Sequence, residues 1–260
     1  MLLVFLSSPL LESIVNPPPE NRHIRSFVRR DGRITDAQRY ALESLWAEYG
    51  VEVAASGIPP QTACAPACVA GDEVLDFAFL FGGRHAPQHL EIGIGMGDAL
   101  VEMAHADHES NYLGIDVHRP GLGSAIQKAH ARGLKNLRVM SADAITVLQK
   151  NLPNASLEAV YLFFPDPWPK RRHHKRRIVN AAFAQSISRV LKSGGHFHMA
   201  TDWQEYAQHM MDVMSAAPGY VNIAGAGQYV PRPDYRPLTK FEQRGQRLGH
   251  GIWDLIFAKE

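Results

Sequence analysis

The sequence predicts an α/β protein, a doubly wound domain whose mostly parallel sheet carries helices on both faces. Two observations lead to this prediction. From about residue 70, short apolar runs typical of strands alternate with longer runs of helical periodicity, the order expected of successive βαβ units. A glycine-rich turn follows the first of these strands, and acidic residues follow the next ones. With 260 residues, the chain is long enough to bury a substantial core.

The overall composition excludes a uniformly basic nucleic-acid-binding protein. There are 27 Lys and Arg residues against 26 Asp and Glu residues, a formal net charge of +1. Any site for a polyanion must therefore come from local segregation of charge. The only two cysteines, Cys64 and Cys68, lack the second ligand pair of a zinc site, so we expect free thiols in a reducing cytoplasm and no metal.

The N-terminal part of the chain divides into two segments. Residues 1–21 are apolar but interrupted by prolines and lack a basic start, so we expect a flexible extension, with a signal peptide as the alternative. Residues 22–50 form a basic segment placed on the single domain that we expect to span 22–260. Within it, residues 22–33 hold five arginines and one aspartate, which fits a solvated linker and a phosphate-contacting segment equally well.

The expected elements follow in order. Thr35–Tyr49 has helical periodicity with Thr35 as N-cap and Gly50 as the stop. We expect a loop over 51–70 and a short helix over 72–81. Strands are predicted at 90–92, 112–115, 137–140, 157–164, 196–202 (after a turn at Gly194–Gly195) and 252–258, and helices at 98–104, 121–132, 144–152, 180–191 and 205–214.

The glycine-rich turn at 93–97 indicates a ligand that approaches the backbone closely. Gly93, Gly95 and Gly97 lie between a strand and a helix, where side chains would block the ligand. The spacing G-x-G-x-G alone also fits a dinucleotide-binding protein. Glu91, two positions before the first glycine, would repel a pyrophosphate and suits a cationic ligand. This combination favours S-adenosylmethionine, which carries a sulfonium.

Two further acids follow later strands. Asp116 comes about 20 residues after the glycine turn, where a carboxylate accepts both ribose hydroxyls of an adenosine, in S-adenosylmethionine or in NAD. Asp143 follows the next strand and can bind the exocyclic amine of adenine. Each acid alone could be a helix N-cap, but with Glu91 there are three in order, at successive strand ends around a glycine turn, and these are harder to attribute to capping.

The stretch from Tyr161 to Arg177 combines a carboxylate with a basic run. Asp166 follows an apolar strand and lies between two prolines, and Trp168 comes next. Six Lys and Arg residues and two His residues then fall within residues 170–177. Asp166 could simply cap the following turn and the basic run could be a solvated face, but together they indicate a catalytic pocket facing a polyanion.

Several motifs occur in a fixed order that resembles one family: LEIGIGMG (90–97), GIDVHRPG (114–121), LRVMSADA (137–144), FFPDPWPKRRHHKRR (163–177), HMATDW (198–203) and TKFEQRGQRLGHGIWDL (239–255). Together they closely resemble the bacterial tRNA (guanine-N7-)-methyltransferases, from about residue 22 to the end. The resemblance implies a seven-stranded class I methyltransferase (Rossmann-like) fold that methylates N7 of a guanine in the variable loop of tRNA.

The resemblance also assigns roles to residues. It implies that S-adenosylmethionine contacts Glu91, the three glycines of the turn, Asp116, Asp143 and Asp166, with Asp166 also catalytic. It places RNA or the target guanine against Lys170, Arg172, His173, His174, Lys175, Arg176, Arg177, Asp202, Thr239, Lys240, Phe241 and Glu242. Asp166 acts either by stabilising positive charge or by orienting the guanine. We expect a cytoplasmic protein without membrane contact, monomeric, with tRNA as its partner.

Three other functions compete with this one. A nicotinamide-dependent oxidoreductase would share the glycine turn and Asp116 but leaves residues 163–177 without a purpose. A non-catalytic RNA-binding module explains the arginines but not the series of acids. A methyltransferase acting on a small molecule or a protein would use the acids and waste the basic surface.

Overall fold

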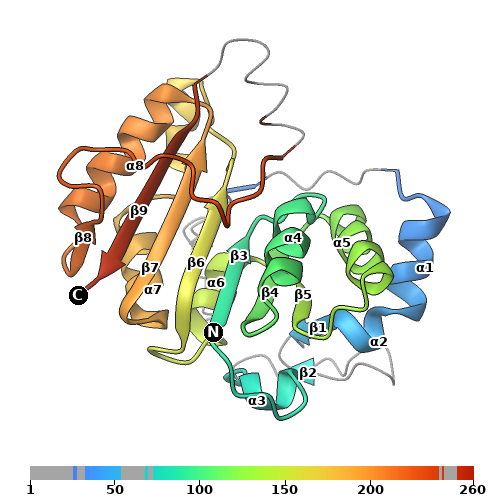
Figure 1. Cartoon of the computed structure of the whole chain (residues 1–260). Coiled ribbons are helices and arrows are strands. Elements are labelled where there is room, and N and C mark those ends of the chain that lie inside the picture. Colours follow the sequence, from blue (N-terminus) through green and yellow to red (C-terminus); the bar gives the residue numbers. More distant parts are fainter. Residues whose placement is uncertain (1–25, 28–32, 54–67, 70–72, 240–241, 243–250) are drawn as a thin grey trace, which may run out of the picture.

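A single mixed sheet forms the centre of the computed structural model (Figure 1), with nine strands in the order β2-β1-β5-β4-β3-β6-β7-β9-β8 among the residues described. The structure describes residues 26–27, 33–53, 68–69, 73–239, 242 and 251–260. The strands are β1 (Gly50–Val53), β2 (Cys68–Val69), β3 (Gln88–Ile92), β4 (Asn111–Asp116), β5 (Leu137–Ser141), β6 (Leu157–Phe163), β7 (Leu191–Thr201), β8 (Tyr220–Asn222) and β9 (Trp253–Lys259).

The strands from β2 to β7 pair in parallel, and only β8 and β9 run antiparallel to their neighbours. The mostly parallel sheet predicted from the sequence is therefore confirmed. The seven strands from β5 to β8 form its main body, and the short β1 and β2 extend it at the β5 edge. Parallel neighbours require crossover connections, and helices supply most of them here.

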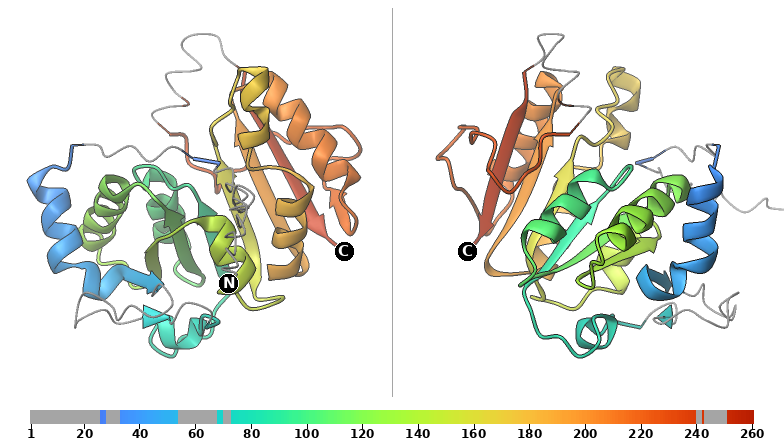
Figure 2. Two further views of the ribbon diagram at one scale, coloured as in Figure 1. Left: turned by 180° about the vertical axis from the view of Figure 1, so that it is seen from behind. Right: turned by 45° about the vertical axis from the view of Figure 1, so that its right-hand side comes forward.

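Helices cover both faces, as the sequence predicted (Figures 1 and 2). One face packs against α1, α4 and α5, through side chains such as Leu42, Leu100 and Ile126. The other packs against α6, α7 and α8, through side chains such as Leu148, Ile187 and Met210. The helices are α1 (Asp36–Ser44), α2 (Trp46–Tyr49), α3 (Phe77–Leu80), α4 (Asp98–Ala106), α5 (Arg119–Ala131), α6 (Ala144–Lys150), α7 (Ala181–Val190) and α8 (Gln204–Ala216), with the 3₁₀ helix η1 (Arg171–Arg176).

Thr35 begins the first helix through a capping box. Its Oγ1 accepts a hydrogen bond from the backbone of Gln38 at 3.2 Å, and the Gln38 side chain accepts one from the backbone of Thr35 at 2.9 Å. The two bonds satisfy donors that a helix start leaves free. The predicted N-cap is thus confirmed, although the helix is interrupted at Leu45 and continues as α2.

The sequence prediction was wrong at four boundaries. The expected loop over 51–70 contains β1 and β2, because β1 finds hydrogen-bond partners on the edge of β5. Where a helix was expected over 72–81, the residues described form only the short helix α3 (Phe77–Leu80). Strand β7 begins at Leu191 and runs through the predicted Gly194–Gly195 turn. Strand β8 was missed because it is three residues long and largely exposed.

In the part of the chain that the structure describes, no helix is both long and apolar enough to cross a membrane. The N-terminal extension at 1–21 lies outside the described residues.

Candidate active site

Four acids lie at or near one end of four neighbouring parallel strands. Glu91 belongs to β3, Asp116 is the last residue of β4, and Asp143 and Asp166 follow β5 and β6. Because β5, β4, β3 and β6 pair in parallel, their carboxyl ends meet at the same edge of the sheet. Ligands of doubly wound sheets bind in the crevice outside this edge.

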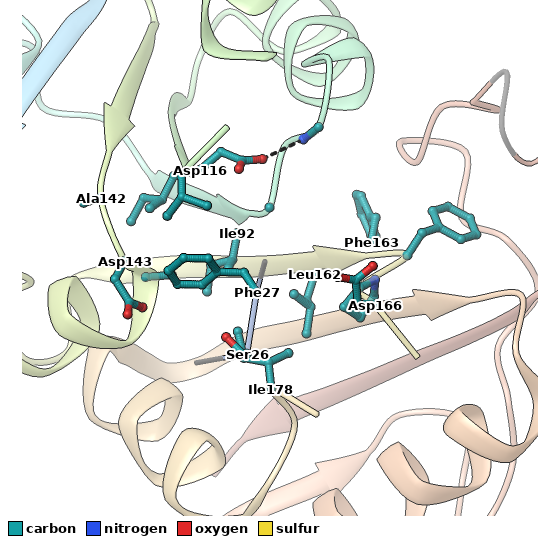
Figure 3. A pocket seen from close by; sticks show the side chains of 17 residues that line it. Ser26, Phe27, Ile92, Asp116, Ala142, Asp143, Leu162, Phe163, Asp166 and Ile178 are labelled. Carbon is teal, nitrogen blue, oxygen red and sulfur yellow. Dashed lines mark hydrogen bonds between the residues drawn. The ribbon is translucent and has the colours of Figure 1, made fainter. Parts of the chain in front are cut away.

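A pocket of about 260 Å³ opens at this edge (Figure 3), close to the lower limit of about 300 Å³ for small-molecule sites. It gathers most of the residues that the sequence predicted for the cofactor, together with apolar side chains from the strands. The lining comprises Ser26, Phe27, Ile92, Gly93, Gly95, Ile115, Asp116, Val117, Ala142, Asp143, Ala144, Leu162, Phe163, Phe164, Pro165, Asp166 and Ile178.

The glycine turn is open on its pocket side and tight on its helix side. Gly93, Gly95 and Gly97 all have positive φ, at 76°, 55° and 75°. A Cβ added to Gly93 or Gly95 would meet nothing within 4 Å, whereas one on Gly97 would lie 2.4 Å from the Cβ of Ala125. A Cβ on Gly121, in the first turn of α5, would lie 1.9 Å from the carbonyl oxygen of Gly95. The turn is therefore fixed against α5 and free toward a ligand.

Asp116 shapes this turn as well as lining the pocket. Its Oδ2 accepts a hydrogen bond from the backbone of Gly95 at 3.0 Å, and its Oδ1 accepts one from the backbone of His118 at 2.9 Å. Burial raises the pKa of this carboxyl, although the two backbone hydrogen bonds act in the opposite direction. Asp116 thus joins the end of β4 to the glycine turn on β3.

Glu91 lies beneath the pocket rather than in its wall. Its side chain is only 3% exposed, and its Oε2 has no hydrogen-bond partner among the described residues. Burial, followed by the negative charge of Asp116, raises the pKa of Glu91 to about 8. A buried polar atom without a partner costs free energy, so this carboxyl is suited to a donor or cation supplied by a ligand.

Asp143 has two roles. Its carboxylate accepts a hydrogen bond from the backbone of Ile145 at 3.0 Å and so caps α6. It also lines the pocket, where its side chain lies beside the ring of Phe27 (Figure 3). The capping interpretation of Asp143 is therefore confirmed, and contact of the same carboxylate with the cofactor stays a prediction.

The loop carrying Asp166 is held in an unusual backbone conformation. Phe164 and Trp168, on either side of it, have positive φ of 51° and 46°, which costs about 1–3 kcal/mol at each non-glycine residue. Two contacts hold the loop: Trp168 Nε1 donates to the carbonyl oxygen of Ser26 at 3.2 Å, and Arg177 Nε donates to that of Pro167 at 3.0 Å. Both contacts lie after Asp166, and before it the backbone N–H of Phe164 donates to the carbonyl oxygen of Ala200 at 2.8 Å. The exposed Asp166 side chain therefore lies on a loop held on both sides.

The basic run after this loop forms the 3₁₀ helix η1. Lys170, Arg171, Arg172 and Lys175 are exposed. Arg176 is half-buried, with its guanidinium carbon 4.8 Å from the centre of the Trp168 ring. This surface adjoins the start of α8, because His174 Nε2 lies 3.6 Å from Glu205 Oε1. His173 and His174 are half-buried, and partial desolvation with the neighbouring cations lowers the pKa of His173.

Arg177 differs from the rest of the run. Its side chain is 3% exposed and bonds to Pro167, to His174 and, at 3.3 Å, to Glu205. Its guanidinium also lies over the Tyr206 ring at 5.0 Å. The buried environment of Arg177 therefore does not fit the expected contact with RNA. Its side chain instead joins the Asp166 loop to α8.

The remaining expected substrate residues lie outside the pocket lining. Asp202 follows β7, the next strand beyond β6. Thr239 Oγ1 accepts a hydrogen bond from the backbone of Glu242 at 3.2 Å. Glu242 is 1% exposed, and both of its carboxylate oxygens bond to Arg236. Lys240 and Phe241 lie outside the described residues.

Sequence reasoning missed three groups of residues in or behind the pocket. Ser26 and Phe27 come from the basic N-terminal segment, where only the apolar residues between arginines indicated packing. Phe163 and Phe164 have the pattern of ordinary strand residues. Arg236 belongs to a segment with the composition of an RNA-facing loop, and nothing in the sequence indicates that it is buried.

A second hollow, about 960 Å³, lies between α7 and α8. It is larger than the pocket at the strand ends, but its walls are mainly small or apolar side chains and it has no set of converging acids. Within the described residues, no group of three or more His, Cys, Asp or Glu side chains could hold a metal ion. The chemistry therefore favours the smaller pocket at the strand ends.

The contact between Gly121 and Gly95 predicts the effect of one added methyl group. We expect Gly121→Ala to lower the free energy of unfolding by about 1–3 kcal/mol, because the methyl group must displace the Gly95 carbonyl. Urea unfolding checks this. The matched control is Gly194→Ala, where the methyl group meets nothing within 4 Å and only the positive φ adds a cost. Equal destabilisation of the two variants would contradict the close approach of Gly121 to Gly95.

Glu91 predicts a pH dependence of stability in the protein without ligand. Its pKa of about 8 exceeds the unfolded value of 4.5, so its contribution is complete below 4.5 and is lost as the pH rises toward 8. Glu91→Gln removes this titration. We therefore expect the free energy of unfolding of the wild type to fall relative to the variant between pH 5 and 8. If the free energies of unfolding of the two proteins changed in parallel with pH, Glu91 would have an ordinary pKa and the prediction would be wrong.

Comparison with known proteins agrees with this site. A family model described as "Putative methyltransferase" matches residues 85–255. The tRNA (guanine-N(7)-)-methyltransferase of Hydrogenovibrio crunogenus is 53% identical over 95% of this chain and 96% of its own length. The enzymes of the same name from Aeromonas hydrophila and Cronobacter sakazakii are 55% and 54% identical over 92% of this chain, and over 93% and 92% of their own lengths. The chain belongs to the tRNA (guanine-N(7)-)-methyltransferase family.

Proposed function

We propose that this protein transfers a methyl group from S-adenosylmethionine to N7 of a guanine in the variable loop of tRNA. The proposal rests on two features that lie at the same edge of the sheet. A pocket lined by acids and open glycines lies there, and the exposed cations of η1 follow directly after its last acid. Family membership supports the same reaction.

The pocket residues fit S-adenosylmethionine. A side chain at Gly93 or Gly95 would fill the space on the pocket side of the turn. Asp116 offers carboxylate oxygens to ribose hydroxyls, and Asp143 offers one to the adenine amine. The Glu91 carboxyl, buried and with an oxygen unpartnered among the described residues, suits the ammonium group of the amino acid part. S-adenosylmethionine supplies an electrophilic methyl group on a sulfonium.

The chemistry at guanine N7 asks the protein for alignment more than for proton removal. N7 of the neutral base has an in-plane lone pair, so no general base is needed to create the nucleophile. The rate then depends on holding the reacting atoms in line and excluding water. The held loop around Asp166 and the apolar walls formed by Leu162, Phe163 and Phe164 are suited to this.

Asp166 has two possible contributions that use the same carboxylate. The target guanine becomes cationic during transfer, and a fixed negative charge stabilises positive charge along the reacting line. The same oxygens can instead accept hydrogen bonds from N1–H and N2–H of the guanine and orient the base. Neither contribution requires Asp166 to take a proton.

The proposed RNA-binding surface includes fewer residues than the sequence indicated. Exposed cations of η1 and its flank supply phosphate contacts, and Trp203, at the start of the neighbouring α8, is 39% exposed and offers a ring for stacking. Arg177 and Glu242 are assigned to structural contacts instead. We expect the protein to act in the cytoplasm as a monomer.

One experiment tests the proposal against its competitors. Purified protein is incubated with methyl-labelled S-adenosylmethionine and unmodified tRNA, and the nucleosides of the product are separated. We expect label in 7-methylguanosine from the variable loop. Label in another nucleoside, or none despite binding of both substrates, would contradict the proposed reaction. Nicotinamide-dependent reduction of a small molecule would favour an oxidoreductase.

Asp166→Asn tests the role of the carboxylate. The substitution keeps the shape of the side chain and removes its charge, so we expect kcat to fall about 100-fold or more because charge stabilisation is removed. Steady-state kinetics at saturating tRNA measure kcat, and calorimetry measures cofactor affinity. Together they separate an effect on methyl transfer from an effect on cofactor binding. A kcat within about threefold of the wild type would remove Asp166 from the central role.

Arg172→Glu tests the basic surface. We expect tRNA affinity to fall and the slope of log K against log salt to become shallower by about one for each phosphate that the variant no longer neutralises. Lys192→Glu is the matched control, since Lys192 is also exposed but lies at the other end of β7. Filter binding at several salt concentrations measures both variants. Equal effects of the two reversals would contradict a localised RNA surface.

A further inference from the structure

Arg236 is a buried cation on a segment with little regular structure. It lies between β8 and β9, on the segment that crosses the sheet in front of β7 and β6 in Figure 1. The side chain is 1% exposed and is the largest fully buried one among the described residues. Burying a guanidinium is costly unless it is fully paired. The contacts that offset this cost therefore show what Arg236 does.

Two carboxylates surround the guanidinium. Glu242 accepts from Nη1 at 2.6 Å and from Nη2 at 2.9 Å, a two-pronged pair that only Arg can form. Asp254, on β9, accepts from Nη2 at 2.9 Å. Although burial acts to lower it, the hydrogen bonds and charges of Glu242 and Asp254 raise the pKa of Arg236. One cation thus joins Glu242 to Asp254 on the sheet.

A neutral histidine extends this network. His198 on β7 is fully buried, and burial lowers its pKa although Asp254 acts in the opposite direction. Its Nε2 lies 2.8 Å from Asp254 Oδ1 and its Nδ1 lies 3.0 Å from the hydroxyl of Tyr235. With Nε2 as donor and Nδ1 as acceptor, both ring nitrogens are satisfied. The segment is therefore attached to β7 through Tyr235 and to β9 through Arg236.

The same guanidinium also contacts the wall of the pocket. Its carbon lies 5.9 Å from the centre of the Phe163 ring and 5.7 Å from that of Phe164. Both rings line the pocket, and Phe164 carries the positive φ that begins the Asp166 loop. The backbone N–H of Phe164 donates to the carbonyl oxygen of Ala200 at 2.8 Å. Arg236 therefore packs against the ring of Phe164, the residue with the strained backbone.

We propose that Arg236 is a positioning residue that fixes the Phe163–Asp166 strand end and the Glu242 carboxylate relative to each other. This inference rests on the proposed function and deepens it. It assigns Arg236 to the interior rather than to the RNA, and it gives the Glu242 carboxylate to Arg236. Asp166 then depends, for its alignment, on a residue that touches neither substrate nor cofactor.

The test compares Arg236→Lys with Glu242→Gln. Lysine keeps the charge but lacks the paired hydrogen bonds and the flat packing on the phenylalanine rings, whereas glutamine leaves Arg236 paired with Asp254. We expect kcat to fall about 10- to 100-fold in Arg236→Lys and less in Glu242→Gln. We expect KM for tRNA and affinity for S-adenosylhomocysteine to change less than about threefold in both. Arg132→Lys, an exposed arginine that pairs with Glu102 at the end of α5, is the matched control and should retain wild-type kcat.

A second readout needs no substrate. Hydrogen exchange of the folded wild type and of both variants measures the protection of the Phe164 amide. In Arg236→Lys this protection should fall at least tenfold, while the protection of the amides of β4 and β5 should not change. Glu242→Gln carries the test if Arg236→Lys does not fold. Unchanged kcat and unchanged Phe164 protection would overturn the inference, as would a raised KM for tRNA with unchanged kcat. A wild type that fails to methylate tRNA, while Phe164 still loses protection in the variant, would overturn the proposed function alone.

Discussion

The parallel pairing of β5, β4, β3 and β6 is the constraint on which the site depends. Parallel strands end at a common edge, so residues that are far apart along the chain arrive at one pocket without direct contacts among them. Glu91, Asp116, Asp143 and Asp166 are brought together in this way. The helices on both faces bury the strands and hold the register. The pocket is thus a consequence of the sheet topology and only secondarily of its own side chains.

The charges at this edge are divided by depth. Glu91 is buried, and its Oε2 has no hydrogen-bond partner in the part of the chain that the structure describes. Burial raises the pKa of this carboxyl, and a bound cation would favour its ionised form. The cations of η1 are mostly exposed, where they keep their hydration until a phosphate replaces it. The loop with the exposed Asp166 joins β6 to these cations, and it is held before Asp166 by Ala200 and after it by Ser26 and Arg177. A reaction that moves positive charge from cofactor to base fits this order.

The sequence predicted the sheet, most element positions and the pocket acids, because periodicity and strand-end acids are local signals. It could not show what lies behind the pocket. Arg236 and Glu242 come from a segment rich in Pro and Arg, typical of an exposed loop. Only the folded chain brings Arg236 against the rings of Phe163 and Phe164 and pairs it with Glu242. Arg177 was grouped with its exposed neighbours for the same reason. Burial of a charged residue is decided by long-range partners, which short-range patterns do not contain.

A structure of the protein with S-adenosylhomocysteine tests the central claim most directly. The account predicts the ribose hydroxyls on Asp116, the adenine beside Asp143, the amino acid part beside Gly93 and Gly95, and the sulfur facing the Asp166 loop. S-adenosylhomocysteine found in the hollow between α7 and α8, or bound at the strand ends in the reverse direction with its sulfur away from Asp166, would contradict it.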